Sequence, residues 1–244
     1  MDAPVDIRQT HRNCPPARLT PPQRKERLDK QNFSLPPRFI RGIQALLFIF
    51  SALGANGQSA FFAPIREAII SVPDQKLVVM EGGKKIATFP VSTSKFGLGD
   101  RRNSWSTPIG TLRVAQKIGD RIPPGAVFRK RRPTGEILQP NAPGRDPIVT
   151  RILWLSGTEN GNRNAYERCI YIHGTTEEKM IGKPASFGCI RMKSRDVIVL
   201  YEMLSVGSNV SIVTEKVRKA VSSVAFAKLR PIAQMGATTM VAPK

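Results

Sequence analysis

Two short segments of the chain place a histidine and a cysteine sixteen residues apart, each beside a glycine. The first reads Ile172-His173-Gly174-Thr175, and the second reads Ser186-Phe187-Gly188-Cys189-Ile190-Arg191-Met192. A thiol is a strong nucleophile only as a thiolate, and a neighbouring imidazole is a common base for forming one. The other histidine, His11, lies in an N-terminal segment that we expect to be removed. Imidazole chemistry in the mature protein would therefore depend on His173.

The residues around this pair can support acyl chemistry. The backbone carbonyl that follows His173 can accept its second ring proton and so select one tautomer. Gly188 permits a tight turn in front of the nucleophile. The backbone N–H groups of Phe187, Gly188 and Cys189 can converge on a developing oxyanion. Arg191 offers a forked cation either to a substrate carboxylate or to a structural carboxylate within the protein.

Short β-type runs dominate the elements that must position these residues. A Gly82-Gly83 pair between two such runs predicts a hairpin with a primed turn, and Ala165–His173 is predicted as a strand with Cys169 and His173 on the same face. A helix is predicted to begin near Ser194, taken as its N-cap, because four apolar residues then recur at helical spacing. The other predicted strands are 68–72, 76–81, 84–91, 111–117, 148–155 and 209–214, with loops at 92–106 and 123–147.

Charge and cysteine content narrow the class of protein. The formal net charge is +20, and without residues 1–60 the chain still has 29 Lys and Arg against 14 Asp and Glu. This excess predicts an anionic partner, and because no nucleic-acid-binding motif is evident, a cell-wall polymer or membrane surface is favoured over nucleic acid. With no CxxC motif and one remaining histidine, no metal or organic cofactor is expected.

The N-terminal segment has the features of an export signal. Residues 1–42 are polar and basic, and an apolar run at residues 43–55 follows Arg41. The run is too short to cross a bilayer, which takes about 20 residues, and small residues near 55–60 suit cleavage. We therefore expect a leader at 1–60, with a short uncleaved membrane anchor, or a true start near Leu28 or Leu35, as the alternatives. Membrane contact is expected only through this leader, which leaves one domain at 64–214 and a basic tail at 215–244.

Taken together, the His-Gly-Thr and Ser-x-Gly-Cys segments resemble the L,D-transpeptidase catalytic domain, the YkuD-like family of bacterial cell-wall enzymes. The likeness extends to Ser104–Ile118, which contains Thr107-Pro108-Ile109-Gly110-Thr111, and to Ile148–Ser156. It covers roughly residues 69–214. The resemblance implies a mostly β fold, a YkuD-like β-sandwich with one short helix after the catalytic cysteine.

The resemblance also implies roles for individual residues. Cys189 would be the acylated nucleophile, His173 the general base, and Gly174 the residue whose carbonyl orients the imidazole. The backbone of Phe187, Gly188 and Cys189 would form the oxyanion hole, and Ser186 and Arg191 occupy motif positions that support the site. Many family members carry histidine where Phe187 stands, so this chain lacks a second imidazole there. A disulfide between Cys169 and Cys189, if it formed, would silence the enzyme.

The implied reaction is transfer of a peptidoglycan stem peptide through a cysteine thioester. Cys189 would attack the carbonyl of the third stem residue, a diaminopimelate, and release the terminal D-Ala. A second stem amine as acceptor would give a 3–3 crosslink, a lysine of a wall-anchored protein would attach that protein, and water would make the enzyme an L,D-carboxypeptidase. The protein would be exported, periplasmic or wall-associated. Two rivals are a hydrolase of the same fold that cuts existing links and a catalytically silent basic wall-binding module.

Overall fold

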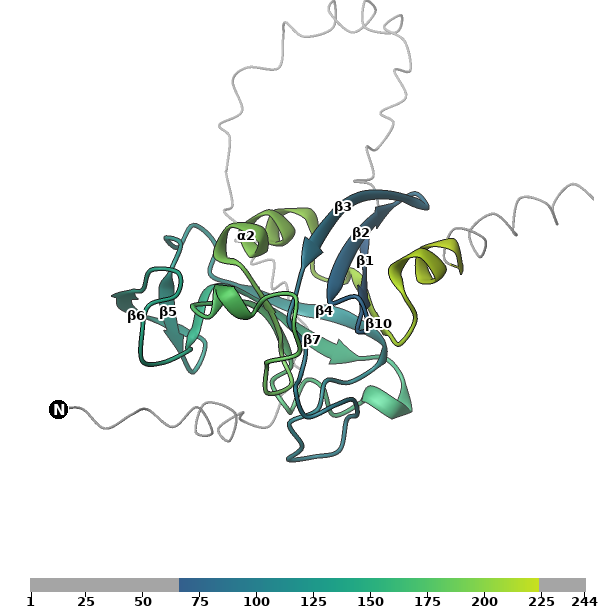
Figure 1. Cartoon of the computed structure of the whole chain (residues 1–244), viewed down its shortest axis with the longest axis horizontal. Helices are drawn as coiled ribbons and strands as arrows, with labels where there is room; N and C mark the ends of the chain where they lie inside the picture. The colour runs from purple at the N-terminus through teal and green to yellow at the C-terminus, as the bar shows by residue number, and fades with distance from the viewer. Residues whose placement is uncertain (1–65, 224–244) are drawn as a thin grey trace, which may run out of the picture. The chain divides into compact units, whose positions relative to one another are not determined.

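The computed structural model describes residues 66–223 of the chain, so the predicted leader and most of the basic tail lie outside the described residues. Figure 1 shows the described part as a set of short strands with one labelled helix. Within residues 66–223, no helix is long and apolar enough to cross a membrane.

All named strands belong to one mixed sheet. Its hydrogen-bonded order is β3-β2-β1-β10-β4-β7-β5-β6, with β8 added beside β7 and β9 beside β8. The β1–β10 and β8–β9 pairs are parallel, and the remaining pairs are antiparallel. The strands are β1 (Arg66–Ser71), β2 (Lys76–Glu81), β3 (Lys84–Pro90), β4 (Gly110–Ile118), β5 (Ala126–Arg129), β6 (Arg132–Ile137), β7 (Ile148–Gly157), β8 (Tyr171–Thr175), β9 (Ile190–Met192) and β10 (Asn209–Val213). The predicted mostly β class is confirmed.

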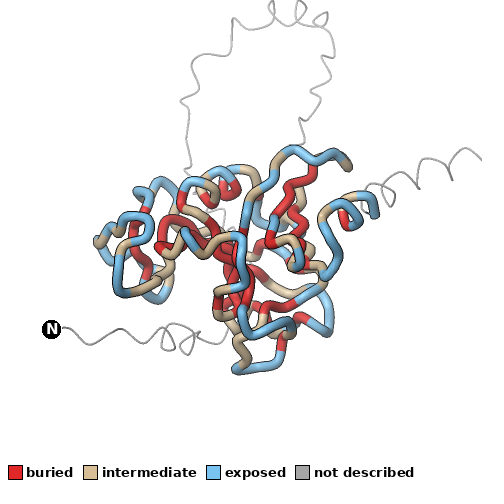
Figure 2. Tube along the Cα trace, viewed as in Figure 1, coloured by how far each residue is buried: buried red, intermediate tan, exposed pale blue. Residues whose placement is uncertain are grey.

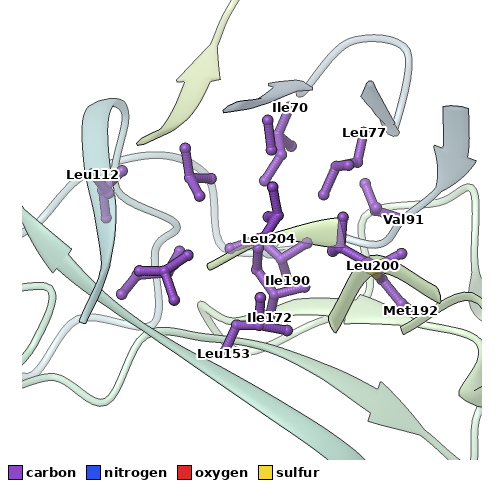
Figure 3. Close-up of a cluster of buried hydrophobic side chains, with 14 of the residues drawn as sticks. Ile70, Leu77, Val91, Leu112, Leu153, Ile172, Ile190, Met192, Leu200 and Leu204 are labelled. Carbon is purple, nitrogen blue, oxygen red and sulfur yellow. The ribbon is translucent and has the colours of Figure 1, made fainter. Parts of the chain in front are cut away.

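The main hydrophobic core joins side chains of the helix α2 (Ser194–Met203) to side chains of β1, β2, β4, β7, β8, β9 and β10. In Figure 3, Ile70 and Leu77 from β1 and β2 lie on one side and Leu153, Ile172 and Ile190 on the other, with Leu200 and Leu204 between them. The period-2 and period-3.6 patterns of apolar residues in the sequence account for these facing surfaces. The core thus holds β8 and β9, to which the two motif segments belong, against α2.

Several local predictions are confirmed. Gly82 and Gly83 both have positive φ, 57° and 82°, so the β2–β3 turn is of the primed type that needs two such residues. In α2, Val197, Leu200 and Tyr201 are buried together, as the helical spacing predicts.

The predicted cap of α2 is wrong. The N-cap position is Lys193, without a side-chain cap bond, and the helix begins at Ser194 itself. The carboxylate of Glu178 accepts the backbone N–H of Ser194 at 2.8 Å, and the hydroxyl of Ser194 lies 2.8 Å from that of Thr150. The Glu178 carboxylate, sixteen residues away in the sequence, therefore accepts a backbone N–H at the start of the helix, and the Ser194 side chain does not cap it.

The segments on either side of the central strands differ more from the prediction. The expected loop at 123–147 contains the β5–β6 hairpin, whose second strand is exposed (Figure 2). The prolines and glycines that suggested a loop are accommodated because β6 is an edge strand. The expected strand at Ala165–His173 is also misplaced, since residues 163–169 form turns and β8 begins only at Tyr171.

The first residues of the predicted tail pack against the sheet. Residues 217–223 are helical, and Val217, Ala220 and Val221 cover the face of β1 and β2 opposite the main core. The carboxylate of Asp74 accepts the backbone N–H of Val217 at 2.7 Å, which satisfies one of the unpaired donors at the start of this helix. The basic tail therefore begins as a docked helix over its described residues.

Candidate functional site

The two motif segments meet because β8 and β9 are parallel neighbours. Their register pairs Ile172 with Ile190 and His173 with Arg191, so Cys189 enters β9 beside Tyr171. Ile172 and Ile190 point into the main core, whereas Tyr171 and Cys189 belong to a second buried cluster on the other face. Because side chains alternate along a strand, His173 lies on the same face as Tyr171 and Cys189. His173 and Cys189 are sixteen residues apart in the sequence, and the parallel pairing of β8 with β9 brings them to within two register positions of each other.

The imidazole of His173 is buried and held by the backbone. Its Nδ1 lies 2.8 Å from the carbonyl oxygen of Gly174. A carbonyl can only accept, so Nδ1 must carry the proton of the neutral ring, which leaves Nε2 as the basic nitrogen. This is the tautomer that a general base requires.

Gly174 is at this position because nothing larger fits. A Cβ there would lie 2.6 Å from the carbonyl oxygen of Val149 and 3.1 Å from the Cβ of Thr150. These close contacts arise at a bulge in β7, where the pairing with β8 shifts between Val149 and Ile152. Thr150 within the bulge has φ of +73°, which is strained for a β-branched residue. No pattern in the sequence indicates this bulge, which packs against the Gly174 backbone that orients His173.

The thiol of Cys189 is buried and neutral at rest. It is a free thiol rather than half of a disulfide with Cys169. Its Sγ lies 3.4 Å from the N–H of Tyr171, which donates to it, and 3.2 Å from the carbonyl oxygen of Cys169, to which it donates. Burial raises the pKa of the thiol from 9.0 to about 11, against the smaller lowering effects of the Tyr171 N–H and the guanidinium groups of Arg191 and Arg168. The thiol therefore needs a base to react at neutral pH.

The raised pKa of the Cys189 thiol predicts how the free energy of unfolding depends on pH. The unfolded thiol ionises near pH 9 and the folded thiol near pH 11, so its contribution to stability is complete below pH 9 and is lost as the pH rises toward 11. Between pH 8 and pH 10.5, the free energy of unfolding of the wild type should fall by about 2 kcal/mol more than that of Cys189→Ala. Urea unfolding of both proteins at the two pH values, with reductant present, measures this difference. Parallel losses in the two proteins would contradict it.

The turn in front of Cys189 is fixed by short-range bonds. The Ser186 hydroxyl donates to the carbonyl of Cys189 at 2.5 Å and accepts the N–H of Gly188 at 3.2 Å. Gly188 has φ of +117°, and a Cβ there would lie 3.3 Å from the carbonyl oxygen of Ser106. Glycine is needed here for both its conformation and its small size.

The three backbone donors expected to form an oxyanion hole are not equivalent. The N–H of Gly188 is already directed at Ser186. Among residues 66–223, the N–H groups of Phe187 and Cys189 have no hydrogen-bond acceptor. These two groups are therefore the ones whose geometry leaves them able to meet a substrate oxygen.

Arg191 pairs with a carboxylate of the protein itself. Its Nη2 lies 2.7 Å from Oδ2 of Asp146, with both side chains more than nine-tenths buried, and its Nη1 donates to the carbonyl of Ala185 at 3.3 Å. Asp146 also accepts a hydrogen bond from the hydroxyl of Thr175, next to Gly174. In the structure, Arg191 therefore pairs with a carboxylate within the protein, which was one of its two predicted partners. Asp146 is a supporting residue that the sequence did not reveal.

A second buried ion pair holds the loop at residues 92–107 beside the nucleophile. Arg168 Nη1 lies 2.8 Å from Oδ1 of Asp100, and Arg168 Nη2 donates to the carbonyl of Ser106 at 2.6 Å. The hydroxyl of Thr107 donates to the carbonyl of Gly188 at 2.9 Å. Neither charged residue stood out in the sequence, because each lies in a segment rich in other charges. Within the described residues, no cluster of three or more His, Cys, Asp or Glu side chains is placed to hold a metal ion.

Comparison with known proteins points to one family. Residues 65–212 match the family model of the L,D-transpeptidase catalytic domain, also called YkuD. No curated protein sequence matches the chain.

Among solved structures, an L,D-transpeptidase from Mycobacterium smegmatis is 20% identical, with a TM-score of 0.39, over 62% of this chain and 59% of that one. L,D-transpeptidase 3 from Mycobacterium tuberculosis is 16% identical, with a TM-score of 0.39, over 61% and 60%. The L,D-transpeptidase from Xylanimonas cellulosilytica is 16% identical, with a TM-score of 0.39, over 62% and 61%. The chain spans less than two thirds of each of these structures.

Proposed function

Since this chain belongs to the L,D-transpeptidase catalytic domain family, we propose that it is a cysteine acyltransferase acting on the stem peptides of peptidoglycan. The observation that carries the proposal is the arrangement of Cys189, His173 and Gly174 on adjacent parallel strands. A buried neutral thiol, a neighbouring imidazole in the basic tautomer and two backbone N–H groups without acceptors are the components of thioester formation.

The first half-reaction begins with proton transfer. His173 takes the proton of the Cys189 thiol at Nε2, and the resulting imidazolium is stabilised by the carbonyl of Gly174. The thiolate attacks the carbonyl of the third stem residue, a diaminopimelate, and the oxyanion faces the N–H groups of Phe187 and Cys189. The C–N bond to D-Ala then breaks, and the imidazolium returns its proton to the leaving amine, so that a thioester and free D-Ala result.

The second half-reaction releases the acyl group to an acceptor. An amine of another stem attacks the thioester, His173 removes its extra proton, and a 3–3 crosslink forms. A protein lysine would attach a protein to the wall in the same way, and water would yield a trimmed stem. The proposed substrate places the working protein outside the cytoplasm, in the periplasm or at the wall, which agrees with the predicted leader.

The intact mass of the purified full-length chain tests this function. After incubation with the tetrapeptide L-Ala-γ-D-Glu-diaminopimelate-D-Ala, we expect a mass increase equal to the tripeptide acyl group, together with released D-Ala. Cys189→Ala should show neither change. An adduct that persists in Cys189→Ala, or a reduced wild type that releases no D-Ala, would contradict the proposal and favour a silent wall-binding module.

A further inference from the structure

A partly exposed aromatic surface carrying one lysine lies beside the turn that holds the nucleophile. We call it the aromatic shelf, and it consists of Lys95, Phe96, Trp105 and Phe187. The ring centroid of Phe187 lies 5.4 Å from that of Phe96 and 5.8 Å from that of Trp105. The ammonium of Lys95 lies 4.7 Å from the Phe187 centroid and 5.3 Å from the Phe96 centroid. Phe187 stands two residues before Cys189, and a Cβ on Gly188 would lie 3.5 Å from the carbonyl oxygen of Trp105, so the shelf adjoins the turn that carries Cys189.

The shelf is attached rigidly to the turn that carries Cys189. The backbone N–H of Lys95 donates to the carbonyl of Ser186 at 3.1 Å. The hydroxyl of Ser94 donates to the carbonyl of Trp105 at 2.5 Å, and its N–H donates to the Thr107 hydroxyl. The Thr107 hydroxyl in turn donates to the carbonyl of Gly188. A ligand bound on the shelf would therefore be held in a fixed position relative to the nucleophile.

The exposure of the shelf is not explained by packing. Phe96 is 49% exposed, and Lys95 is also exposed, whereas Trp105 and Phe187 are half-buried. No carboxylate of residues 66–223 forms an ion pair with Lys95. An exposed apolar surface with one unneutralised cation, beside a reactive thiol, has the composition of a binding site for a small apolar group that carries one negative charge.

We propose that the aromatic shelf binds the C-terminal D-amino acid of the acyl-donor stem peptide. The terminal carboxylate pairs with the Lys95 ammonium, and the small side chain lies against the rings of Phe96 and Phe187. The acceptor is a poorer fit, because its reacting group is an amine that the Lys95 ammonium repels. The proposal rests on the proposed function and names the substrate group that this part of the site recognises.

Binding of two peptides to the full-length Cys189→Ala variant tests the assignment without any turnover. The probes are the tetrapeptide with a free C-terminal carboxylate and the same peptide with a C-terminal amide, measured by titration calorimetry. We expect the acid to bind about 3- to 5-fold more tightly than the amide, the range of an exposed charge pair. Adding Lys95→Gln should abolish this preference, whereas adding Lys183→Gln, an exposed lysine outside the shelf, should retain it. Adding Phe96→Ala should weaken both peptides by a similar factor.

Two results would overturn the assignment. One is equal affinity for acid and amide in Cys189→Ala, and the other is an acid preference that survives Lys95→Gln. Because these measurements need no thioester, they separate the two claims. If the protein forms the adduct but binds acid and amide equally, the proposed function stands and the assignment of the shelf is contradicted. If the protein prefers the acid but forms no adduct, the binding site on the shelf stands and the proposed acyltransferase function is contradicted.

Discussion

Replacement of His173 is expected to slow acylation of Cys189 by about 10²- to 10⁴-fold at pH 7, the usual contribution of a general base. Burial raises the pKa of the thiol to about 11, so at pH 7 only about one thiol in 10⁴ is ionised without help. In the proposed mechanism the imidazole removes this penalty, because Gly174 holds its Nδ1 and leaves Nε2 as the basic nitrogen. The loss in the variant should therefore be largest near neutral pH.

The pH profile separates loss of a base from loss of structure. Without the imidazole, the rate should rise about tenfold per pH unit until it levels near pH 11, since only spontaneous ionisation supplies thiolate. The wild-type rate should have a much shallower dependence above neutral pH. Alkylation of Cys189 by iodoacetamide, followed by peptide mass spectrometry, gives the same comparison without a peptide substrate.

Two variants provide a matched pair for this experiment. His173→Asn can place an amide N–H near the position of Nδ1 and keep the bond to the Gly174 carbonyl, whereas His173→Gln places its amide near Nε2. Both lack a base, so both should be slow, but the asparagine variant should unfold closer to the wild type. Wild-type reactivity of either variant at pH 7 would show that another group ionises Cys189.

The candidate residues His173 and Cys189 could be singled out from the sequence because their signals are local. A histidine before a glycine and a cysteine after one are visible without knowledge of the fold, and so are the short apolar runs of β1 and β2 and the alternating buried residues of β10. The short strand β9 has only three residues, too few to show a period, and so it was not predicted. The predicted strand before His173 is too long because Cys169 has φ of +55°, a turn conformation that the strand propensity of its neighbours does not indicate.

The groups that support the site come from distant loops, and local patterns could not identify them. Asp146 lies in a Pro- and Gly-rich segment, and only the folded chain brings it to Arg191. Asp100 and Arg168 sit among several other charges and are distinguished only by their burial. The strain at Thr150 depends on how β7 pairs with β8, a long-range property. The candidate residues were therefore predictable from residue type and spacing, whereas the groups that position them required the tertiary structure.

Removal of the Asp146 carboxylate is expected to destabilise the fold by about 3–5 kcal/mol, the usual effect of breaking one side of a buried ion pair. The side chains of Arg191 and Asp146 are 9% and 7% exposed, so Asp146→Ala would leave a guanidinium in a poorly solvated place without its counter-ion. It would also remove the acceptor for the Thr175 hydroxyl. Urea unfolding of the full-length chain at pH 7 measures the loss.

An exposed pair in the same protein serves as the control. Arg102 and Glu167 lie 2.7 Å apart, but their side chains are 71% and 48% exposed. Glu167→Ala should therefore cost about 1 kcal/mol or less, because water solvates the remaining arginine and screens the pair. Similar losses for Asp146→Ala and Glu167→Ala would contradict the assignment of Asp146 as a buried structural partner.

Asp146→Asn distinguishes a structural arginine from a substrate-binding one. The amide keeps an oxygen for Thr175 but removes the charge opposite Arg191, so stability should fall while the fold persists. If Arg191 is structural, tetrapeptide affinity of the Cys189→Ala background should stay within about 2-fold, since the guanidinium remains bonded to the Ala185 carbonyl. If its true partner were the substrate carboxylate, freeing the cation from Asp146 should instead tighten peptide binding. Unchanged affinity with reduced stability is the expected result, because the ion pair joins β9 to the loop that contains Asp146 and does not itself bind the peptide.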